Sequence, residues 1–206
     1  MNKPSFEIEN ISQGVVLGID EAGCGPWAGP VVAAAVMIDQ SLFPLSFYEK
    51  INDSKKISKK HRQDLYLELT HHHCIYYSIG LSSVEEIDNL NIIQASHLAM
   101  KKALENYPQP FDSILIDGSR KPSWNYNNTQ AIIKGDQKSF SIAAASIIAK
   151  VNRDNIMNEL HQQYPYYFWD KNAGYGTPDH RKGIHTHGIC PHHRKSFAPI
   201  RKLLTV

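Results

Sequence analysis

The sequence predicts an α/β fold, in which helices pack on a sheet of mixed strand direction. Short β-branched apolar segments and longer helical segments follow one another in mixed order along the chain. The length of 206 residues is one that a single hydrophobic core commonly serves. No internal repeat, low-complexity tract or linker-like change of composition divides the chain. We therefore expect residues 1–206 to form a single domain.

The first half of the chain is expected to form a hairpin, a helix and a third strand. Residues 14–20 (GVVLGID) are apolar and β-branched, and a loop rich in Gly and Pro joins them to a second strand over 31–38. Such a pair is typical of an antiparallel hairpin. Ser58 is placed to cap a surface helix over 59–69, and residues 74–81 (CIYYSIGL) follow as a strand.

The second half is expected to form a helix, two short strands and a long helix. Apolar residues over 87–107 recur at near-helical spacing until Pro108. Residues 113–117 (SILID) and 131–136 (AIIKGD) are predicted to be short buried strands, and the Ala- and Ile-rich segment 139–164 is the strongest predicted helix. The remainder is basic and rich in histidine.

The composition narrows the class of protein. Hydrophobic residues make up 42% and charged residues 20%, as in ordinary globular proteins, and the net charge of +2 does not by itself indicate a polyanionic partner. The three cysteines lie far apart, which argues against a disulfide framework. The polar start and the lack of an apolar run of about 20 residues argue against secretion and membrane spanning. We expect a cytoplasmic protein, with a monomer as the default.

Acidic residues stand at the ends of three predicted strands: Asp20 with Glu21 after it, Asp117 and Asp136. If these ends share one side of the sheet, four carboxylates converge and repel one another unless divalent cations neutralise them. Oxygen ligands favour Mg²⁺ or Mn²⁺, and two such ions about 4 Å apart can clamp the attacking and leaving oxygens of a phosphodiester. Each Asp alone is also a common turn residue, and the spacing leaves both interpretations open.

The loop after the first strand contains Gly23, Gly25 and Gly29. The spacing GxGxxxG, interrupted by prolines and followed by a strand, does not fit a dinucleotide-binding fingerprint. Glycines beside the acids would let the backbone approach a sugar closely enough to contact a 2′-hydroxyl. A plain tight turn is the alternative.

Six motifs together resemble ribonuclease HII: GIDEAGCGPWAGPVVAAAV at 18–36, NDSKKIS at 52–58, LIDG at 115–118, GDQKSFSIAAASIIAKVNRD at 135–154, GYGT at 174–177 and HGICPHHRKSFAPI at 187–200. The resemblance covers nearly the whole chain. It implies a ribonuclease H-like fold, a mixed five-stranded sheet flanked by helices. It also implies a helical C-terminal extension, about 165–206, that contributes to substrate binding.

The resemblance implies an endonuclease that hydrolyses the RNA strand of RNA/DNA hybrids. It would also cut 5′ of single ribonucleotides in duplex DNA, leaving 3′-hydroxyl and 5′-phosphate ends. The family's catalytic, metal-binding acids match Asp20, Glu21, Asp117 and Asp136, the same four that follow the predicted strands. Two Mn²⁺ or Mg²⁺ ions are the implied cofactors.

The resemblance also implies substrate contacts. Tyr175 matches a family tyrosine that stacks on the deoxyribose beyond the cleaved junction. Gly23 and Gly25 match the outer glycines of a Gly-Arg-Gly loop, but Cys24 stands where that pattern has Arg. Backbone contacts to the ribose could survive this difference, whereas a positively charged contact would be missing.

Basic side chains are candidates for phosphate contacts. Lys138 and Ser139, beside Asp136, are the expected substrate contacts nearest the acids, and Lys55 is expected to bind substrate as well. The full set of basic candidates is Lys55, Lys56, Lys59, Lys60, Lys138, Arg181, Lys182, Arg194, Lys195, Arg201 and Lys202. We expect roughly a third of them to touch the backbone and to make binding sensitive to salt.

The histidines do not have the spacing of a zinc site. The tail segment CPHH lacks the paired pattern of a structural zinc module, so zinc is not expected there. No spacing assigns a role to His180. Two other functions are possible for such a chain. A noncatalytic nucleic-acid-binding module would be indicated by a missing acid, and a Mg²⁺ phosphatase of small esters leaves the basic tail and the motif series unexplained.

Overall fold

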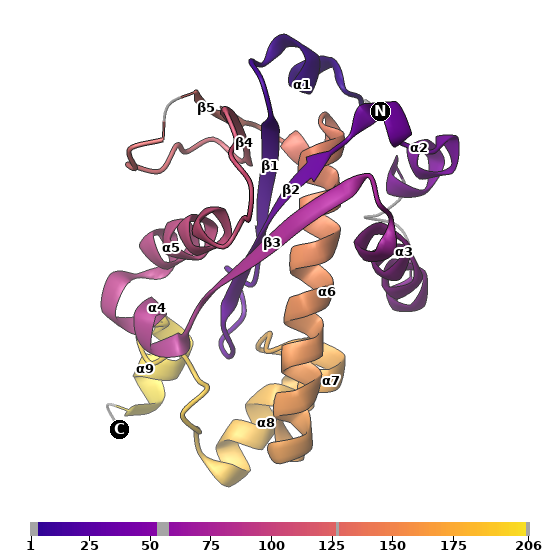
Figure 1. Cartoon of the computed structure of the whole chain (residues 1–206). Coiled ribbons are helices and arrows are strands. Elements are labelled where there is room, and N and C mark those ends of the chain that lie inside the picture. The colour runs from indigo at the N-terminus through magenta and orange to yellow at the C-terminus, as the bar shows by residue number, and fades with distance from the viewer. Residues whose placement is uncertain (1–3, 53–57, 127, 205–206) are drawn as a thin grey trace.

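The fold is a five-stranded mixed sheet with helices on both faces (Figure 1). This computed structural model describes residues 4–52, 58–126 and 128–204. The strands lie in the order β3-β2-β1-β4-β5. Their bounds are β1 Val16–Ala22, β2 Val31–Ile38, β3 Ile75–Ser82, β4 Ser113–Asp117 and β5 Thr129–Ile132. Strand β2 is antiparallel to β1 and β3, and β4 is parallel to β1 and β5, which confirms the predicted hairpin and mixed sheet.

Two long helices cover the sheet. Helix α6 (Phe140–Gln163) packs on one face with α2 (Leu45–Asn52) and α3 (Lys59–His71). Helix α5 (Ile92–Glu105), which follows the short α4 (Val84–Leu90), packs on the other face (Figure 1). Alternate residues of β2 enter the two cores, as the two-residue period of a strand requires. The short α1 (Glu7–Ile11) precedes β1.

The predicted helix over 87–107 is two helices. Asn91 separates α4 from α5 in a left-handed conformation, with φ of 73°. Its side chain accepts hydrogen bonds from the backbone N–H groups of Ile93 and Gln94, and so caps α5. Apolar residues continue at helical spacing across this break, which is why the spacing alone missed it.

The predicted strand over 131–136 was also wrong at its end. Strand β5 stops at Ile132, and Lys134 adopts a left-handed conformation with φ of 56°. Asp136 therefore lies in a short 3₁₀ turn, η2 (Gly135–Gln137), rather than at the end of a strand. Strand β1 continues to Ala22, so Asp20 lies inside the strand rather than at its end, and Glu21 lies within it rather than after it.

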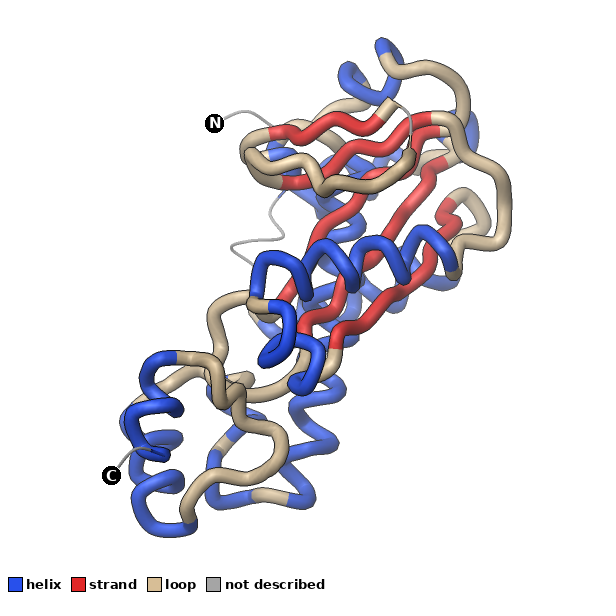
Figure 2. The backbone as a smooth tube through the Cα atoms, turned by 90° about the vertical axis from the view of Figure 1, so that its left-hand side faces the viewer, coloured by secondary structure: helices blue, strands red, loops and turns tan. Residues whose placement is uncertain are grey.

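The C-terminal helices gather at one end of the sheet (Figure 2). They are α7 (Trp169–Asn172), α8 (Pro178–His187) and α9 (Ala198–Leu204), and together with the end of α6 they enclose a separate apolar cluster around Trp169. The loop between β1 and β2 joins this cluster, because Trp27 N–H donates to Gly174 O at 2.8 Å. In the part of the chain that the structure describes, no helix combines the length and apolarity needed to cross a bilayer.

Close packing of β1 on α6 depends on Gly18. A Cβ atom at this position would lie 2.3 Å from the carbonyl carbon of Ser141 and 2.4 Å from the backbone nitrogen of Ile142. We expect Gly18→Ala to lower the free energy of unfolding by about 1–3 kcal/mol or more, because the helix backbone must move away. Urea unfolding measures this, and an unchanged midpoint would show that the two elements are less tightly packed than described.

Candidate active site

Asp117 is held beside the other acids by backbone pairing. Ile19 of β1 is in register with Ile116 of the parallel strand β4. Asp20 follows Ile19 and Asp117 follows Ile116, so the two acids occupy equivalent positions on neighbouring strands. The Oδ1 atom of Asp117 accepts a hydrogen bond from Gly135 N–H at 2.6 Å, which ties the turn that carries Asp136 to the end of β4. Three separate segments of the chain thus bring acids to one end of the sheet.

The electrostatics of these acids show that they share one region. Burial raises the pKa of Asp20 well above its usual value, and the charges of Glu21 and Asp117 raise it further. Burial also raises the pKa of Glu21, with Asp117 contributing, although hydrogen bonds from Cys24 and Ser96 lower it. The pKa of Asp117 is raised by burial and then by Asp136. Asp117 therefore interacts electrostatically with each of the other three acids.

This donor set fits a hard divalent cation. Its oxygens are carboxylates, and Asp20, Glu21 and Asp117 form no ion pair with a lysine or arginine of the described residues. A cation would relieve the mutual repulsion that, together with burial, raises their pKa values. Within the described ranges, however, no three Asp, Glu, His or Cys side chains stand close enough together to form a ready-made metal site. One reason is that Asp20 and Glu21 are consecutive in β1 and point to opposite faces.

A cavity of about 380 Å³ opens beside the acids. Glu21, Cys24, Ser96, Asp117 and Arg120 are among its lining residues, so it runs from the end of the sheet to the start of α5. The thiol of Cys24 donates to Glu21 Oε1 at 3.4 Å. Burial, with the neighbouring Glu21 charge as the second cause, raises the pKa of Cys24 to about 12, so this side chain is a neutral thiol that faces the acids.

The glycine loop and Tyr175 lie side by side. A Cβ atom on Gly25 would be only 3.2 Å from Cε1 of the Tyr175 ring, and Tyr175 is 51% exposed. Gly23 has a φ of +105°, and a Cβ atom there would meet Nε of Arg153 at 2.2 Å. The glycine at 23 is therefore required both by its backbone conformation and by the packing beneath it.

Two predicted contact residues are buried instead. Ser139 caps α6: its hydroxyl accepts from Ile142 N–H and donates to Glu9, and it is fully buried. Arg194 is also fully buried, with its guanidinium donating to backbone carbonyl oxygens, so it cannot reach a phosphate. Ser139 as a substrate contact and Arg194 as a phosphate contact were therefore wrong, because both side chains are used inside the fold.

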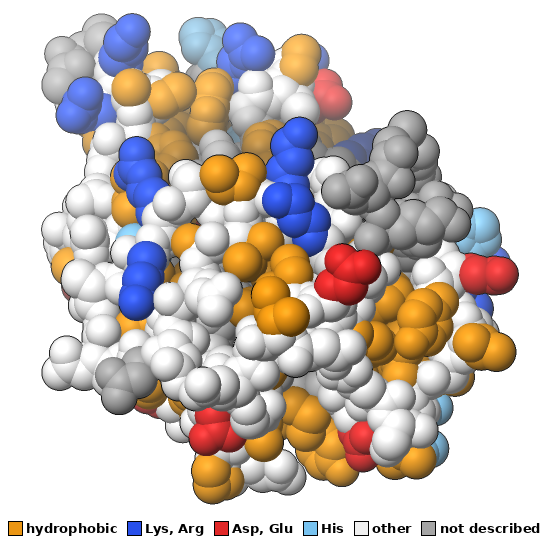
Figure 3. All heavy atoms as spheres, turned by 90° about the horizontal axis from the view of Figure 1, so that it is seen from above, with side chains coloured by type: hydrophobic (Ala, Val, Ile, Leu, Met, Phe, Trp, Pro, Cys, Tyr) orange, Lys and Arg blue, Asp and Glu red, His pale blue; other side chains and the backbone are white. Residues whose placement is uncertain are grey.

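The other basic candidates lie on the surface or outside the residues that the structure describes. Lys138 is exposed, whereas Lys55 and Lys56 lie outside the described residues. Seen from the end that carries α1, lysine and arginine side chains lie dispersed rather than in one continuous patch (Figure 3). That face therefore gives no sign of a continuous track for a nucleic-acid backbone.

Sequence reasoning missed a buried polar network behind Tyr175. Cys190 N–H donates to Nδ1 of His193 at 3.0 Å, so the proton of His193 is on Nε2, which donates to Nε2 of His180 at 3.1 Å. Trp169 Nε1–H donates to the same His180 atom at 3.1 Å, and His180 Nδ1–H donates to Tyr175 O at 2.9 Å. These two histidines thus hold the Tyr175 backbone, and no spacing in the sequence links them.

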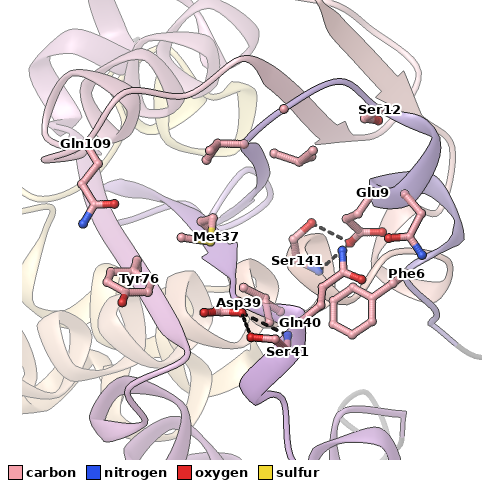
Figure 4. A pocket seen from close by; sticks show the side chains of 15 residues that line it. Phe6, Glu9, Ser12, Met37, Asp39, Gln40, Ser41, Tyr76, Gln109 and Ser141 are labelled. Carbon is pink, nitrogen blue, oxygen red and sulfur yellow. Dashed lines mark hydrogen bonds between the residues drawn. The ribbon is translucent and has the colours of Figure 1, made fainter.

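A larger cavity, of about 580 Å³, lies at the opposite end of β1 (Figure 4). Glu9 of α1 borders it, and Oε1 of Glu9 accepts from the hydroxyls of Ser139 at 2.6 Å and Ser141 at 2.8 Å. These bonds fix α1 on the start of α6. None of the four predicted acids lines this cavity, so it is separate from the carboxylate cluster.

Comparison with known proteins gives a consistent result over nearly the whole chain. The family model described as Ribonuclease HII matches residues 17–200. A ribonuclease HII of Wolbachia pipientis subsp. Culex pipiens is 48% identical over 203 residues, which cover 98% of this chain and 100% of the relative. A ribonuclease HII of Cereibacter sphaeroides is 51% identical over 189 residues, covering 92% of this chain and 86% of that protein.

The fold is similar to solved structures as well. The ribonuclease H2 from Pyrococcus horikoshii OT3 superposes with a TM-score of 0.75 at 26% identity, covering 92% of this chain and 97% of that one. This likeness supports the predicted ribonuclease H-like sheet and helices.

Proposed function

This chain belongs to the ribonuclease HII family and is a metal-dependent endoribonuclease that cleaves RNA in RNA/DNA hybrids and at single embedded ribonucleotides; we propose that Asp20, Glu21, Asp117 and Asp136 are its metal-binding and catalytic residues. The observation that carries this proposal is the position of Asp117, whose charge interacts with each of the other three acids. Two Mn²⁺ or Mg²⁺ ions would supply an activated water and would neutralise the leaving 3′ oxygen.

In this proposal the protein supplies the position of every group. Asp20 and Asp117 are fixed by paired strands, and the bond from Gly135 N–H to Asp117 fixes the turn of Asp136. Rigid ligands limit the reorganisation needed when charge develops on the phosphate. The products are a 3′-hydroxyl and a 5′-phosphate.

Substrate recognition is assigned to the loop Gly23–Cys24–Gly25 and to Tyr175. The closeness of Gly25 to the Tyr175 ring supports this, because one nucleotide could touch both. Backbone groups of the loop would contact the ribose 2′-hydroxyl, while the exposed ring would stack on the adjoining deoxyribose. Lys138, Lys55 and the C-terminal extension over about 165–206 would add contacts to the duplex.

We place the protein in the cytoplasm as a monomer. The three cysteines, Cys24, Cys74 and Cys190, are free thiols, as a reducing compartment favours. Size-exclusion chromatography with light scattering tests the monomer, for which the expected mass is that of one 23.3 kDa chain.

The decisive assay uses duplex DNA that holds one ribonucleotide. With Mn²⁺ or Mg²⁺ we expect a single cut 5′ of the ribonucleotide, and with EDTA none. An all-DNA duplex of the same sequence should stay intact under every condition. Cutting of the all-DNA duplex, or no cutting of the ribonucleotide strand, would overturn the proposal.

Cys24→Arg is expected to tighten substrate binding. An arginine here would stand at the cavity beside Asp117 and Arg120, where a phosphate contact becomes possible, and a hydrogen bond to a charged group contributes about 1.5–3 kcal/mol. We therefore expect the Kd for a ribonucleotide duplex to fall about tenfold or more at low salt. Cys24→Ser, which keeps a donor for Glu21 without adding charge, is the control. Equal affinity of Cys24→Arg and wild type would reject the idea.

A further inference from the structure

Arg194 is a buried side chain near the glycine loop whose hydrogen-bond donors are all occupied. It is fully buried, and each of its five N–H groups donates to a backbone carbonyl oxygen. The acceptors are the carbonyl oxygens of Gly23 at 2.6 Å, Cys24 at 3.3 Å, Pro26 at 2.8 Å, Gly29 at 2.9 Å and Pro30 at 3.2 Å. All five acceptors belong to the loop between β1 and β2. One guanidinium therefore binds backbone carbonyl oxygens along the whole loop between β1 and β2.

Arg153 of α6 completes this arrangement. Its guanidinium donates to Ala28 O at 3.0 Å, Pro30 O at 2.9 Å and Ala173 O at 2.9 Å. Pro30 O accepts from both arginines, and Ala173 lies two residues before Tyr175. The pair thus fastens the loop to α6 and to the segment that leads into Tyr175.

Both guanidiniums remain charged at neutral pH. Burial lowers the pKa of Arg194 to about 9, with the charge of Arg153 as the second cause. All five N–H groups of Arg194 are occupied by carbonyl oxygens, so no carboxylate neutralises it directly. Carbonyl dipoles of the loop solvate this buried charge instead, and breaking the arrangement would leave it uncompensated.

The inward carbonyls determine where the loop amides point. In a planar trans peptide the C=O and N–H groups point in opposite directions. Because the carbonyls of Gly23 and Cys24 face Arg194, the N–H groups of Cys24 and Gly25 face away from it. Neither N–H donates to an acceptor within the described ranges, and Gly25 is exposed. Two unused donors therefore stand on the outer side of the loop, next to the Tyr175 ring.

We propose that Arg194 is the positioning residue for ribose recognition: by turning the Gly23 and Cys24 carbonyls inward, it presents the Cys24 and Gly25 amides to the 2′-oxygen of the ribonucleotide. This inference rests on the proposed function. It also explains how the loop keeps a defined shape with Cys24 in place of arginine, since the organising charge comes from beneath the loop. Backbone donors fixed in advance discriminate more sharply than mobile ones.

The test measures binding rather than cleavage, in an Asp117→Asn background that leaves the duplex intact. We compare Kd values for a duplex with one ribonucleotide and for the all-DNA duplex of the same sequence. Arg194→Lys keeps the charge but has only three donors without the planar fork. We expect it to reduce the preference for the ribonucleotide duplex about tenfold, with the all-DNA Kd unchanged. A purely structural defect would weaken both Kd values by the same factor and would overturn the proposal, as would an unchanged preference.

Arg181→Lys is the matched control. Arg181 is exposed, donates through Nε to Gly176 O at 2.9 Å and lies over the Trp27 ring. It touches none of the carbonyls between Gly23 and Gly25, so the ratio of the two Kd values should equal that of the parent. Any change in affinity should be shared by both duplexes.

A second measurement keeps Arg194 intact, in case Arg194→Lys does not fold. With ¹⁵N-glycine labelling of Asp117→Asn, the Gly25 amide resonance should shift when the ribonucleotide duplex is added and stay near its free position with the all-DNA duplex. Identical shifts with both duplexes would overturn the inference. The wild-type cleavage assay separates the two levels: an inactive wild type refutes the proposed function, whereas an active wild type with these negative results refutes only the role of Arg194.

Discussion

Asp117→Asn is expected to reduce cleavage of a ribonucleotide-containing duplex by at least about 1,000-fold while leaving duplex affinity within a few-fold of wild type. Asp117 interacts with all three other acids, so its removal affects the surroundings of each of the other proposed ligands. Loss of several kcal/mol of transition-state stabilisation corresponds to about three powers of ten in rate. Single-turnover cleavage measures the rate, and fluorescence anisotropy measures the affinity.

The matched control for this variant is Asp112→Asn. Asp112 stands just before the other end of β4, where Oδ2 accepts from Val15 N–H at 2.7 Å. An asparagine oxygen can accept the same hydrogen bond, so we expect cleavage within about twofold of wild type. If Asp112→Asn lost as much activity as Asp117→Asn, the loss would reflect the strand and not a metal ligand.

Asp20→Asn is expected to stabilise the metal-free protein and to abolish most of the stabilisation that divalent metal ions provide. A carboxyl whose folded-state pKa is raised contributes stability when protonated, and this contribution is lost as the pH rises through that pKa. Above that pKa the charged, buried Asp20 destabilises the fold, and asparagine removes the penalty. Divalent ions should stabilise wild type by about 2.7 kcal/mol at 100 times their Kd, and the variant by much less.

Denaturant unfolding at pH 8, in EDTA and in Mn²⁺, tests how the stabilities of wild type and Asp20→Asn compare without and with metal. The variant should be the more stable protein in EDTA, and wild type should gain the more from Mn²⁺. Glu105→Gln is the control, because Glu105 forms only an exposed pair with Lys101 and should change stability by less than about 0.5 kcal/mol. A destabilised Asp20→Asn in EDTA would mean that Asp20 is held by favourable contacts rather than by repulsion.

The sequence predicted the sheet and the acids because both depend on short-range patterns. A continuous apolar run placed β2 at 31–38, and Ser139 at the start of an Ala-rich segment placed α6, since the signals for strands and helix caps are local. The four acids were found because each follows or ends an apolar run. Their electrostatic coupling depends on the strand order, which the spacing of residues in the sequence does not give.

The roles of Arg194 and Ser139 could not be read from spacing. A basic residue in a basic tail has the same local signal whether it binds phosphate or backbone carbonyls, and only the fold decides that Arg194 reaches a loop 164 to 171 residues earlier in the chain. Ser139 was placed near the acids because Asp136 is close to it in the sequence, yet its hydroxyl donates to Glu9 of α1 at the start of α6. The turns with left-handed residues at Asn91 and Lys134 were also not predicted, because the periodicity of apolar residues carries no information about the backbone conformation of single residues.

The most direct test of the central claim is anomalous diffraction from crystals of this protein grown with Mn²⁺ and a ribonucleotide-containing duplex. The account predicts a manganese peak about 2 Å from a carboxylate oxygen of Asp117, with Asp20, Glu21 or Asp136 and a phosphate oxygen completing the coordination. Manganese bound elsewhere, with these four carboxylates free of it in crystals that cut the duplex, would contradict the account.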